Sequence, residues 1–167
     1  GATAAAGSQV DDNLVTQQML QIIKSAGGQP WAGVTIVDED DGSNLIADPS
    51  VPVTMTVYAP AAGSITLKLE DTTSPLDGNG NPSVFIEVEA TLTAGWNEVS
   101  FDVSGAPVGN FDKAALFPDL MVEAADQTYF VDNVSFTKAD LVTVTPPTPP
   151  SDFDELDFED VAACDCH

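Results

Sequence analysis

Alternation of apolar and polar residues with a period of two is the feature that most limits how this chain folds. Successive side chains of a β-strand point to opposite faces, so an alternating segment buries one face and exposes the other. In segment 64–70 (SITLKLE), Ile65, Leu67 and Leu69 share one face. The same alternation occurs in 53–58 (VTMTVY), 84–92 (VFIEVEATL) and 96–104 (WNEVSFDVS). These four segments predict strands with one buried face.

Shorter segments extend this pattern. Residues 17–26 (QQMLQIIKSA) are compatible with a short helix or a strand, and the Gly27-Gly28 pair together with the strands that follow favours a strand. Strands are also expected at 114–117 and 129–137, and residues 77–82 (DGNGNP) predict a turn. The sequence therefore predicts an all-β protein, an antiparallel β-sandwich of the jelly-roll type with about eight to nine strands, within residues 1–144.

The charge balance restricts the partners. The chain has 27 acidic residues, four lysines and no arginine, which gives a formal net charge of −23. Affinity for nucleic acid depends on Lys and Arg, so no nucleic-acid partner is expected. No apolar run is long enough to insert into a membrane. A strongly acidic surface suits a saline or calcium-rich exterior, where self-repulsion is screened.

Composition changes abruptly after residue 144. Residues 145–151 (TPPTPPS) predict an extended Pro/Thr linker. Residues 152–167 form an acidic segment that contains large apolar residues and is expected to form a C-terminal extended strand. The two cysteines, Cys164 and Cys166, lie beside the terminal His167. We expect either that their thiols cross-link to another chain or that the cluster is the beginning of a longer sequence motif.

Catalytic chemistry finds little support. His167 is the only histidine, so the predicted sandwich has neither His nor Cys for a nucleophilic triad. Among so many acidic residues a pair of carboxylates arises by chance, and no phosphate-binding or metalloprotease motif occurs. We therefore expect that the chain is not an enzyme.

Several short motifs occur in the order of a known family. The ordered set consists of 29–34 (QPWAGV), 53–60 (VTMTVYAP), 65–70 (ITLKLE), 88–93 (VEATLT), 95–102 (GWNEVSFD) and 129–134 (YFVDNV). Together they resemble the jelly-roll carbohydrate-binding-type modules that are repeated in secreted glycanases and surface proteins of marine bacteria. The resemblance covers roughly residues 1–137. It implies a non-catalytic, extracellular or cell-surface module that binds polysaccharide or acts as a spacer in a larger protein.

The resemblance also draws attention to the opening strand. Modules of this family usually begin with a strand similar to LDFED, and here Leu156–Asp160 carries that sequence at the C-terminal end. Either the chain is one repeat of an array, or the segment docks on its own sandwich, or it docks on a neighbouring copy. Phe153, Leu156 and Phe158 are the expected docking residues, since main-chain pairing and apolar pockets both favour an added strand. The alternative function is thus a structural subunit of an extracellular filament or adhesin, assembled by donating this strand.

Calcium is the expected ion. The resemblance implies a structural Ca²⁺ between the opening strand and the last one, which maps onto Asp132, Asp157 and Glu159. Calcium prefers carboxylate and carbonyl oxygens. Asp132 shares its strand parity with Phe130 and is therefore expected on the core side, where a carboxylate needs a cation or hydrogen-bond donors.

A second acidic cluster lies in 38–42 (DEDDG). Asp38, Asp40 and Asp41 are a weaker set of calcium ligands, because the cluster lacks the alternating spacing of an EF-hand loop. A solvated turn would satisfy the same residues.

Aromatic rings are the expected sugar platforms, because the apolar face of a pyranose stacks on a flat ring. The candidates are Trp31, Tyr58, Phe85 and Tyr129, and Phe85 lies on the polar face of its strand. Trp96 occupies a position that packs against the core in similar modules. Aromatic residues make up only 7% of the chain, which limits the size of any such platform.

Overall fold

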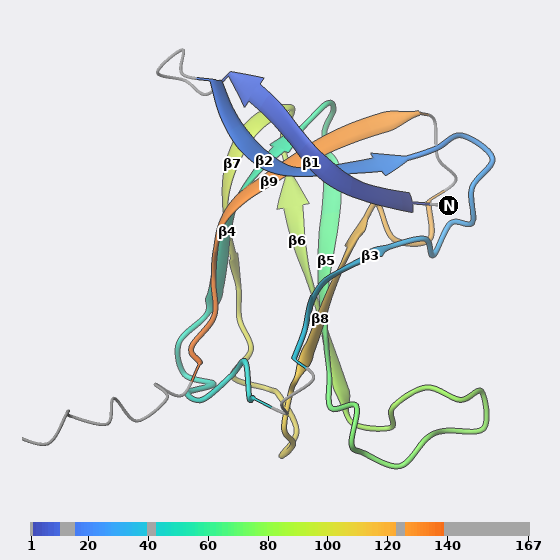
Figure 1. The fold of residues 1–167 in the computed structure, drawn as a ribbon, viewed down its shortest axis with the longest axis vertical. Coiled ribbons are helices and arrows are strands. Elements are labelled where there is room, and N and C mark those ends of the chain that lie inside the picture. Colours follow the sequence, from blue (N-terminus) through green and yellow to red (C-terminus); the bar gives the residue numbers. More distant parts are fainter. Residues whose placement is uncertain (1, 11–15, 40–42, 123–125, 139–167) are drawn as a thin grey trace, which may run out of the picture.

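The structure, a computed structural model, describes residues 2–10, 16–39, 43–122 and 126–138. These residues form nine strands and no helix (Figure 1). The strands are β1 (Ala2–Val10), β2 (Thr16–Lys24), β3 (Val34–Asp38), β4 (Val53–Ala59), β5 (Gly63–Glu70), β6 (Phe85–Leu92), β7 (Gly95–Phe101), β8 (Lys113–Pro118) and β9 (Gln127–Ser135).

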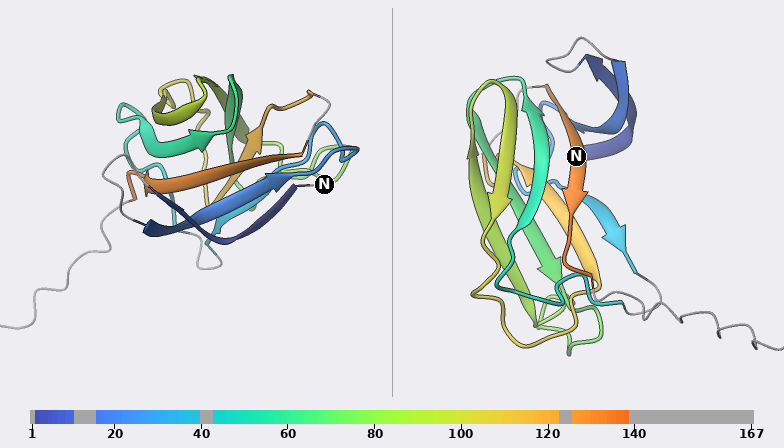
Figure 2. Two further views of the ribbon diagram at one scale, coloured as in Figure 1. Left: turned by 90° about the horizontal axis from the view of Figure 1, so that it is seen from above. Right: turned by 90° about the vertical axis from the view of Figure 1, so that its left-hand side faces the viewer.

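The strands build two antiparallel sheets. The five-stranded sheet has the order β1-β2-β9-β4-β7, and the four-stranded sheet has the order β3-β8-β5-β6. Two faces of antiparallel sheets that pack together with alternating side chains between them make a β-sandwich. The views in Figure 2 show the two layers of strands. The all-β antiparallel sandwich predicted from the alternation is confirmed.

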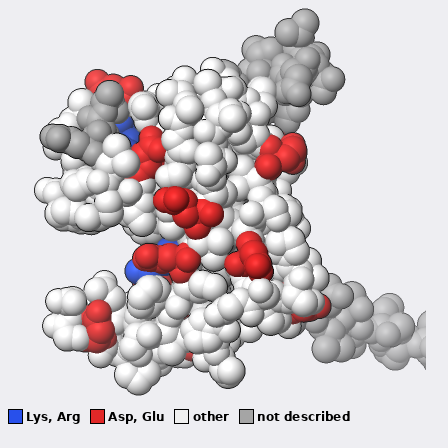
Figure 3. All heavy atoms as spheres, turned by 180° about the vertical axis from the view of Figure 1, so that it is seen from behind, with Lys and Arg blue, Asp and Glu red and all other residues white. Residues whose placement is uncertain are grey.

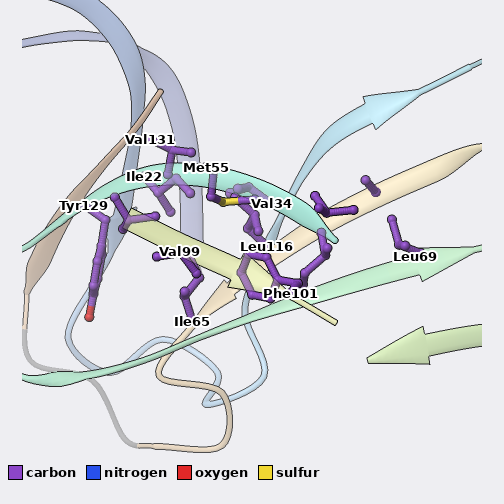
Figure 4. Packing of buried hydrophobic residues seen from close by; sticks show 14 of the residues in the cluster. Ile22, Val34, Met55, Ile65, Leu69, Val99, Phe101, Leu116, Tyr129 and Val131 are labelled. Carbon is purple, nitrogen blue, oxygen red and sulfur yellow. The ribbon is translucent and has the colours of Figure 1, made fainter. Parts of the chain in front are cut away.

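The core follows the predicted faces. Ile65, Leu67 and Leu69 of β5 are completely buried, and so is Phe101 of β7. Figure 4 shows that core side chains come from strands of both sheets and point toward one another. In β6, Ile86 and Val88 are partly buried, whereas Glu87 between them points to the other face and is exposed. Burying this apolar layer is the main favourable contribution to folding.

Two strands were not predicted by alternation. β1 is rich in alanine and shows no alternation, yet it pairs with β2 over its whole length, from Ala2↔Lys24 to Val10↔Thr16. β3 is short, and its pairing with β8 shifts register between Thr35 and Val37. Tertiary pairing therefore forms these strands where local sequence gives a weak signal.

One lysine is buried at an end of the sandwich. The side chain of Lys24 is only 1% exposed, and its ammonium donates hydrogen bonds to the main-chain carbonyls of Pro118 (2.8 Å) and Asp119 (2.5 Å). The Asp119 carboxylate accepts from the Ser64 amide (2.8 Å) and from the Tyr129 hydroxyl (2.7 Å). A buried ammonium requires such partners. This cluster ties the ends of β2 and β8 to the starts of β5 and β9.

Candidate functional site

A row of aromatic rings crosses the outer face of the five-stranded sheet. In β4, Met55 and Val57 point into the core, so Tyr58 points outward. The registers place Trp96 of β7 and Phe130 of β9 opposite Tyr58 on either side. The Tyr58 ring lies 5.4 Å from that of Trp96 and 6.1 Å from that of Phe130, both in edge-on geometry. We call Trp96, Tyr58 and Phe130 the aromatic row. All three side chains are partly exposed.

Polar side chains lie beside the aromatic row on the same face. Thr56 of β4 stands opposite Glu98 of β7 and Asp132 of β9. Its hydroxyl is 3.3 Å from Glu98 Oε1 and 3.4 Å from Asn133 Nδ2. We call Glu98, Thr56, Asp132 and Asn133 the polar row. The right-hand view of Figure 2 shows β7, β4 and β9, the strands that carry both rows.

A β-bulge positions Asn133. The pairing of β9 with β4 shifts register between Thr54 and Thr56, so β9 contains one extra residue there. Asn133 has a φ of 52°, in the left-handed region that asparagine tolerates better than most residues. Its amide nitrogen donates to Asp132 Oδ1 (2.8 Å), and its side chain reaches Thr56 on the neighbouring strand. Bulges often reorient a side chain next to a binding site.

The two rows supply complementary chemistry. Ring faces and edges offer apolar contact, while carboxylates, a hydroxyl and an amide offer hydrogen-bond acceptors and donors. Neighbouring strands lie about 4.8 Å apart, so three rings on three strands span about 10 Å of the sheet. Gln21 of β2 is opposite Phe130 and continues the aromatic row with a polar residue. Such a surface suits an extended ligand with apolar faces and many hydroxyls.

Of the four aromatic residues predicted from sequence, only Tyr58 lies in this row. Tyr129 is 2% exposed and belongs to the core (Figure 4), so its ring offers no surface to a ligand. Burial, together with the neighbouring Asp119 carboxylate, raises the pKa of its hydroxyl well above the ordinary value. The prediction of a platform at Tyr129 is therefore corrected to a structural role at the end of the sandwich.

Trp31 and Phe85 lie on other parts of the surface. Trp31 is 57% exposed in the loop before β3. Phe85 is exposed on the outer face of the four-stranded sheet, as its parity predicted, and Lys68 Nζ lies 5.0 Å from its ring centroid. The structure thus does not bring either residue together with Tyr58.

Sequence reasoning missed two of the three rings. Trp96 was expected to pack against the core, but its parity matches that of the exposed Glu98, whereas Val99 is buried. Phe130 was placed on the core side together with Asp132, yet Val131 between them is the buried residue. The bulge reverses the parity further along, so that Phe136 does pack against the core. The prediction assumed that alternation continues without interruption from Phe136 back to Phe130, and it therefore placed Phe130 and Asp132 on the wrong face of the sheet.

The predicted calcium ligands are not assembled in the described part of the chain. Asp132 lies on the outer face and not on the core side, and Asp38 is exposed at the end of β3. No group of three or more His, Cys, Asp or Glu residues that could hold a metal ion occurs among the residues described. The other predicted ligands (Asp40, Asp41, Asp157 and Glu159) lie outside them. A structural calcium ion therefore stays a prediction that depends on Asp157 and Glu159, with Asp40 and Asp41 in the weaker set of ligands.

The remaining predictions for the C-terminal segment also lie outside the described residues. They concern the linker 145–151, the docking residues Phe153, Leu156 and Phe158, and the cross-linking residues Cys164 and Cys166.

The lysines are all engaged by other groups. Lys68 forms an ion pair with Glu70 (2.9 Å), and Lys113 approaches the same carboxylate at 3.8 Å. Lys138 pairs with Glu39. The space-filling view from behind shows acidic side chains spread over the surface and few basic ones (Figure 3). With 27 acidic residues and four lysines, most carboxylates are screened by solvent ions and not by lysines. The excess of negative charge disfavours anionic ligands.

Other site types find no support in the described ranges. These ranges contain no His or Cys, and no helix in them is long and apolar enough to span a membrane. A depression of about 190 Å³ is lined by apolar residues of two loops, among them Ile46, Pro49, Val108 and Phe111. It brings together no titratable side chains and so has no means of acid–base catalysis.

Comparison with known proteins places the fold. No protein-family model matches the chain, and no curated protein sequence is significantly similar to it. The structure of an exo-β-agarase matches 83% of this chain at a TM-score of 0.53 and 12% identity. The two share a fold. The match spans only 23% of the agarase chain, so it concerns one part of a longer protein. The resemblance to modules of glycanases is confirmed at the level of the β-sandwich.

Weaker similarities extend to isolated modules. A family 30 carbohydrate-binding module of a cellulosomal cellulase from Clostridium thermocellum matches 83% of this chain and 92% of its own, at a TM-score of 0.47 and 13% identity. A second structure of a family 30 module has a TM-score of 0.49 and 10% identity, over 83% of this chain and 91% of its own. At these scores the similarities carry no argument about this chain.

Proposed function

We propose that this chain is a non-catalytic, extracellular carbohydrate-binding module of a larger protein. The aromatic row is the observation that carries the proposal. Three partly exposed rings on adjacent strands, beside a row of polar groups, form the kind of surface on which pyranose rings stack while their hydroxyls are hydrogen-bonded. The shared fold with part of an agarase supports this reading, since polysaccharide is the material on which an agarase acts.

The electrostatics of the site favour uncharged polysaccharide. Glu98 and Asp132 lie beside the aromatic row, and the whole chain carries a formal charge of −23. Bringing a polyanion such as alginate to this face would place like charges close together. Agarose, laminarin and xylan lack that penalty. We therefore propose a neutral glycan as the ligand.

A binding role, without catalysis, agrees with the openness of the face. Glu98 is exposed and its carboxylate accepts a hydrogen bond from Thr56 on an open sheet surface. Glycoside hydrolysis requires two carboxyl groups in distinct protonation states around the scissile bond, in a site that positions the sugar tightly. Incubation with each polysaccharide should therefore release no reducing sugar.

The test is titration of the full chain with soluble oligosaccharides of agarose, laminarin and xylan. Tryptophan fluorescence and calorimetry measure the binding. Trp96→Ala is expected to weaken binding of the active glycan about five- to thirtyfold, because it removes a stacking contact worth about 1–2 kcal/mol. Phe85→Ala is the matched control, since it removes an exposed ring from the other sheet and should leave affinity unchanged. Equal affinity of both variants, or no binding of any neutral glycan, would contradict the proposal.

A further inference from the structure

The outer edge of β3 has no strand partner in the described part of the chain. β3 pairs with β8 on one side only and ends the order of the four-stranded sheet. The right-hand view of Figure 2 shows β3 at the border of the molecule. An edge strand presents unpaired amides and carbonyls, which readily pair with another strand. β3 contains neither proline nor lysine, which commonly block such pairing.

The seam between the two sheets is also incompletely covered beside β3. Ile36 and Val37 of β3 pack against the core but remain partly exposed. By contrast, Val34 at the other end of β3 is buried. A strand added to this edge would cover the exposed apolar area with its inward-facing side chains. The edge therefore offers both main-chain pairing and apolar contact.

The chain itself leaves the sandwich at this edge. Thr137 bridges to Ile46, and the next residue, Lys138, forms an ion pair with Glu39, which directly follows β3. The segment after Lys138 therefore begins next to the end of the unpaired strand. Residues 139–152 have an extended reach of roughly 40 Å, more than twice the length of about 17 Å expected for a five-residue strand such as β3.

We propose that residues 153–160 of this chain pair with the outer edge of β3 in the same molecule. Leu156 and Phe158 share a strand face. With that face turned inward, they cover Ile36 and Val37. The carboxylates at 155, 157 and 159 then point outward into solvent, where ions screen their repulsion from the exposed Asp38 of β3. A tether that starts beside its docking edge holds the segment at an effective concentration in the millimolar range, which favours docking within one molecule over docking on another.

Hydrogen exchange of the full chain tests this inference, under reducing conditions so that Cys164 and Cys166 cannot link two copies. The amides of residues 34–38 are expected to exchange at least about tenfold more slowly in the wild type than in the double variant Leu156→Asp/Phe158→Asp. The control, Val161→Asp/Ala163→Asp, adds the same charge outside the segment and should retain the slow exchange. Exchange in β5 should be equal in all three proteins, which shows that the sandwich remains folded.

The state of association separates the alternatives. Docking within one molecule predicts a monomer in sedimentation at low and at high micromolar concentration, with the same protection of β3 throughout. Protection that appears only with concentration, together with oligomers that the double variant abolishes, would overturn the inference in favour of strand donation between copies. Equal exchange of residues 34–38 in the wild type and the double variant would show that this segment does not pair with β3.

Discussion

The ring of Tyr58 packs edge-on against the ring of Trp96 on the neighbouring strand, with an interplanar angle of 68°. Edge-on pairs contribute about 0.5–1.5 kcal/mol beyond the area they bury. Because Tyr58 also contacts Phe130 at 63°, the three rings support one another on a surface that water reaches. The orientation of each ring is thus fixed by its neighbours before any ligand arrives, and preorganised contacts lower the entropic cost of binding.

Tyr58 is the central ring, and its removal should have the largest effect on the site. Tyr58→Ala is expected to weaken glycan binding more than Phe130→Ala, because it removes one ring and both of the edge contacts that hold the other two. We expect a loss of about 30-fold or more, against about tenfold for Phe130→Ala. Calorimetric titration of both variants with the same oligosaccharide measures the difference. Equal losses would show that the rings act independently.

Asn133 should tolerate glycine but not a β-branched residue. Its φ of 52° costs little for glycine and about 1–2 kcal/mol or more for valine. Asn133→Val is therefore expected to lower the free energy of unfolding by about that amount, and Asn133→Gly to change it by less than about 0.5 kcal/mol. Both variants lose the contact with Thr56, so both should weaken glycan binding to a similar degree. Urea unfolding and titration separate the two effects. An Asn133→Val variant as stable as the wild type would show that residue 133 does not require a left-handed backbone conformation.

Lys24 should be the lysine on which stability depends most. Lys24→Met keeps the length of the side chain but leaves the carbonyl oxygens of Pro118 and Asp119 without their donor. We expect a loss of about 2–4 kcal/mol in the free energy of unfolding. Lys138→Met removes an exposed ion pair and should cost less than about 1 kcal/mol. Urea denaturation at neutral pH compares the two, and a stable Lys24→Met variant would show that the carbonyls find other partners.

Asp71 should contribute to loss of stability in acid. Its carboxylate accepts hydrogen bonds from the Thr73 hydroxyl (2.7 Å) and from the main-chain N–H of Asn110 (3.0 Å), and these bonds lower its pKa below the ordinary value of 3.8. The depressed pKa stabilises the folded state above pH 3.8, and this contribution disappears as the pH falls through the lower, folded-state pKa.

Asp71→Asn tests this contribution. At neutral pH we expect it to lower the free energy of unfolding by about 1–2 kcal/mol, because the amide accepts fewer and weaker bonds. As the pH falls below 3.8, the difference from the wild type should shrink. Glu89→Gln, at an exposed residue, should change stability by less than about 0.5 kcal/mol at neutral pH. A difference that stays constant down to pH 2 would mean that the carboxylate charge is not involved.

Alternation alone was enough to predict the strands that surround the core. In β5, Ile65, Leu67 and Leu69 alternate with polar residues, and in the second half of β7 Val99 and Phe101 do the same, so the buried face of these segments follows directly from the sequence. β1 lacked such a signal because alanine and glycine suit many conformations, and its strand exists through pairing with β2. Segments that depend on distant partners cannot be recognised from a local window.

The candidate site was harder to predict than the fold. Tyr129, Phe130 and Val131 are consecutive large apolar residues, so parity alone does not say which of them faces the core. The outcome depends on the bulge after Asp132 and on the register with β4, both of which are tertiary features. Tyr58 was identified correctly because its strand alternates without interruption. The aromatic row as a whole appears only when three strands are placed side by side.

The distribution of the lysines has a practical consequence for digestion of the native protein. Trypsin cleaves after lysine or arginine, and this chain has only four such positions. Lys24, Lys68 and Lys113 lie in paired strands, whose backbone cannot enter a protease cleft without unfolding, whereas Lys138 follows the last strand. Native trypsin treatment should therefore cut once and release residues 1–138 as a single resistant fragment, a simple preparative route to the sandwich freed of its acidic extension.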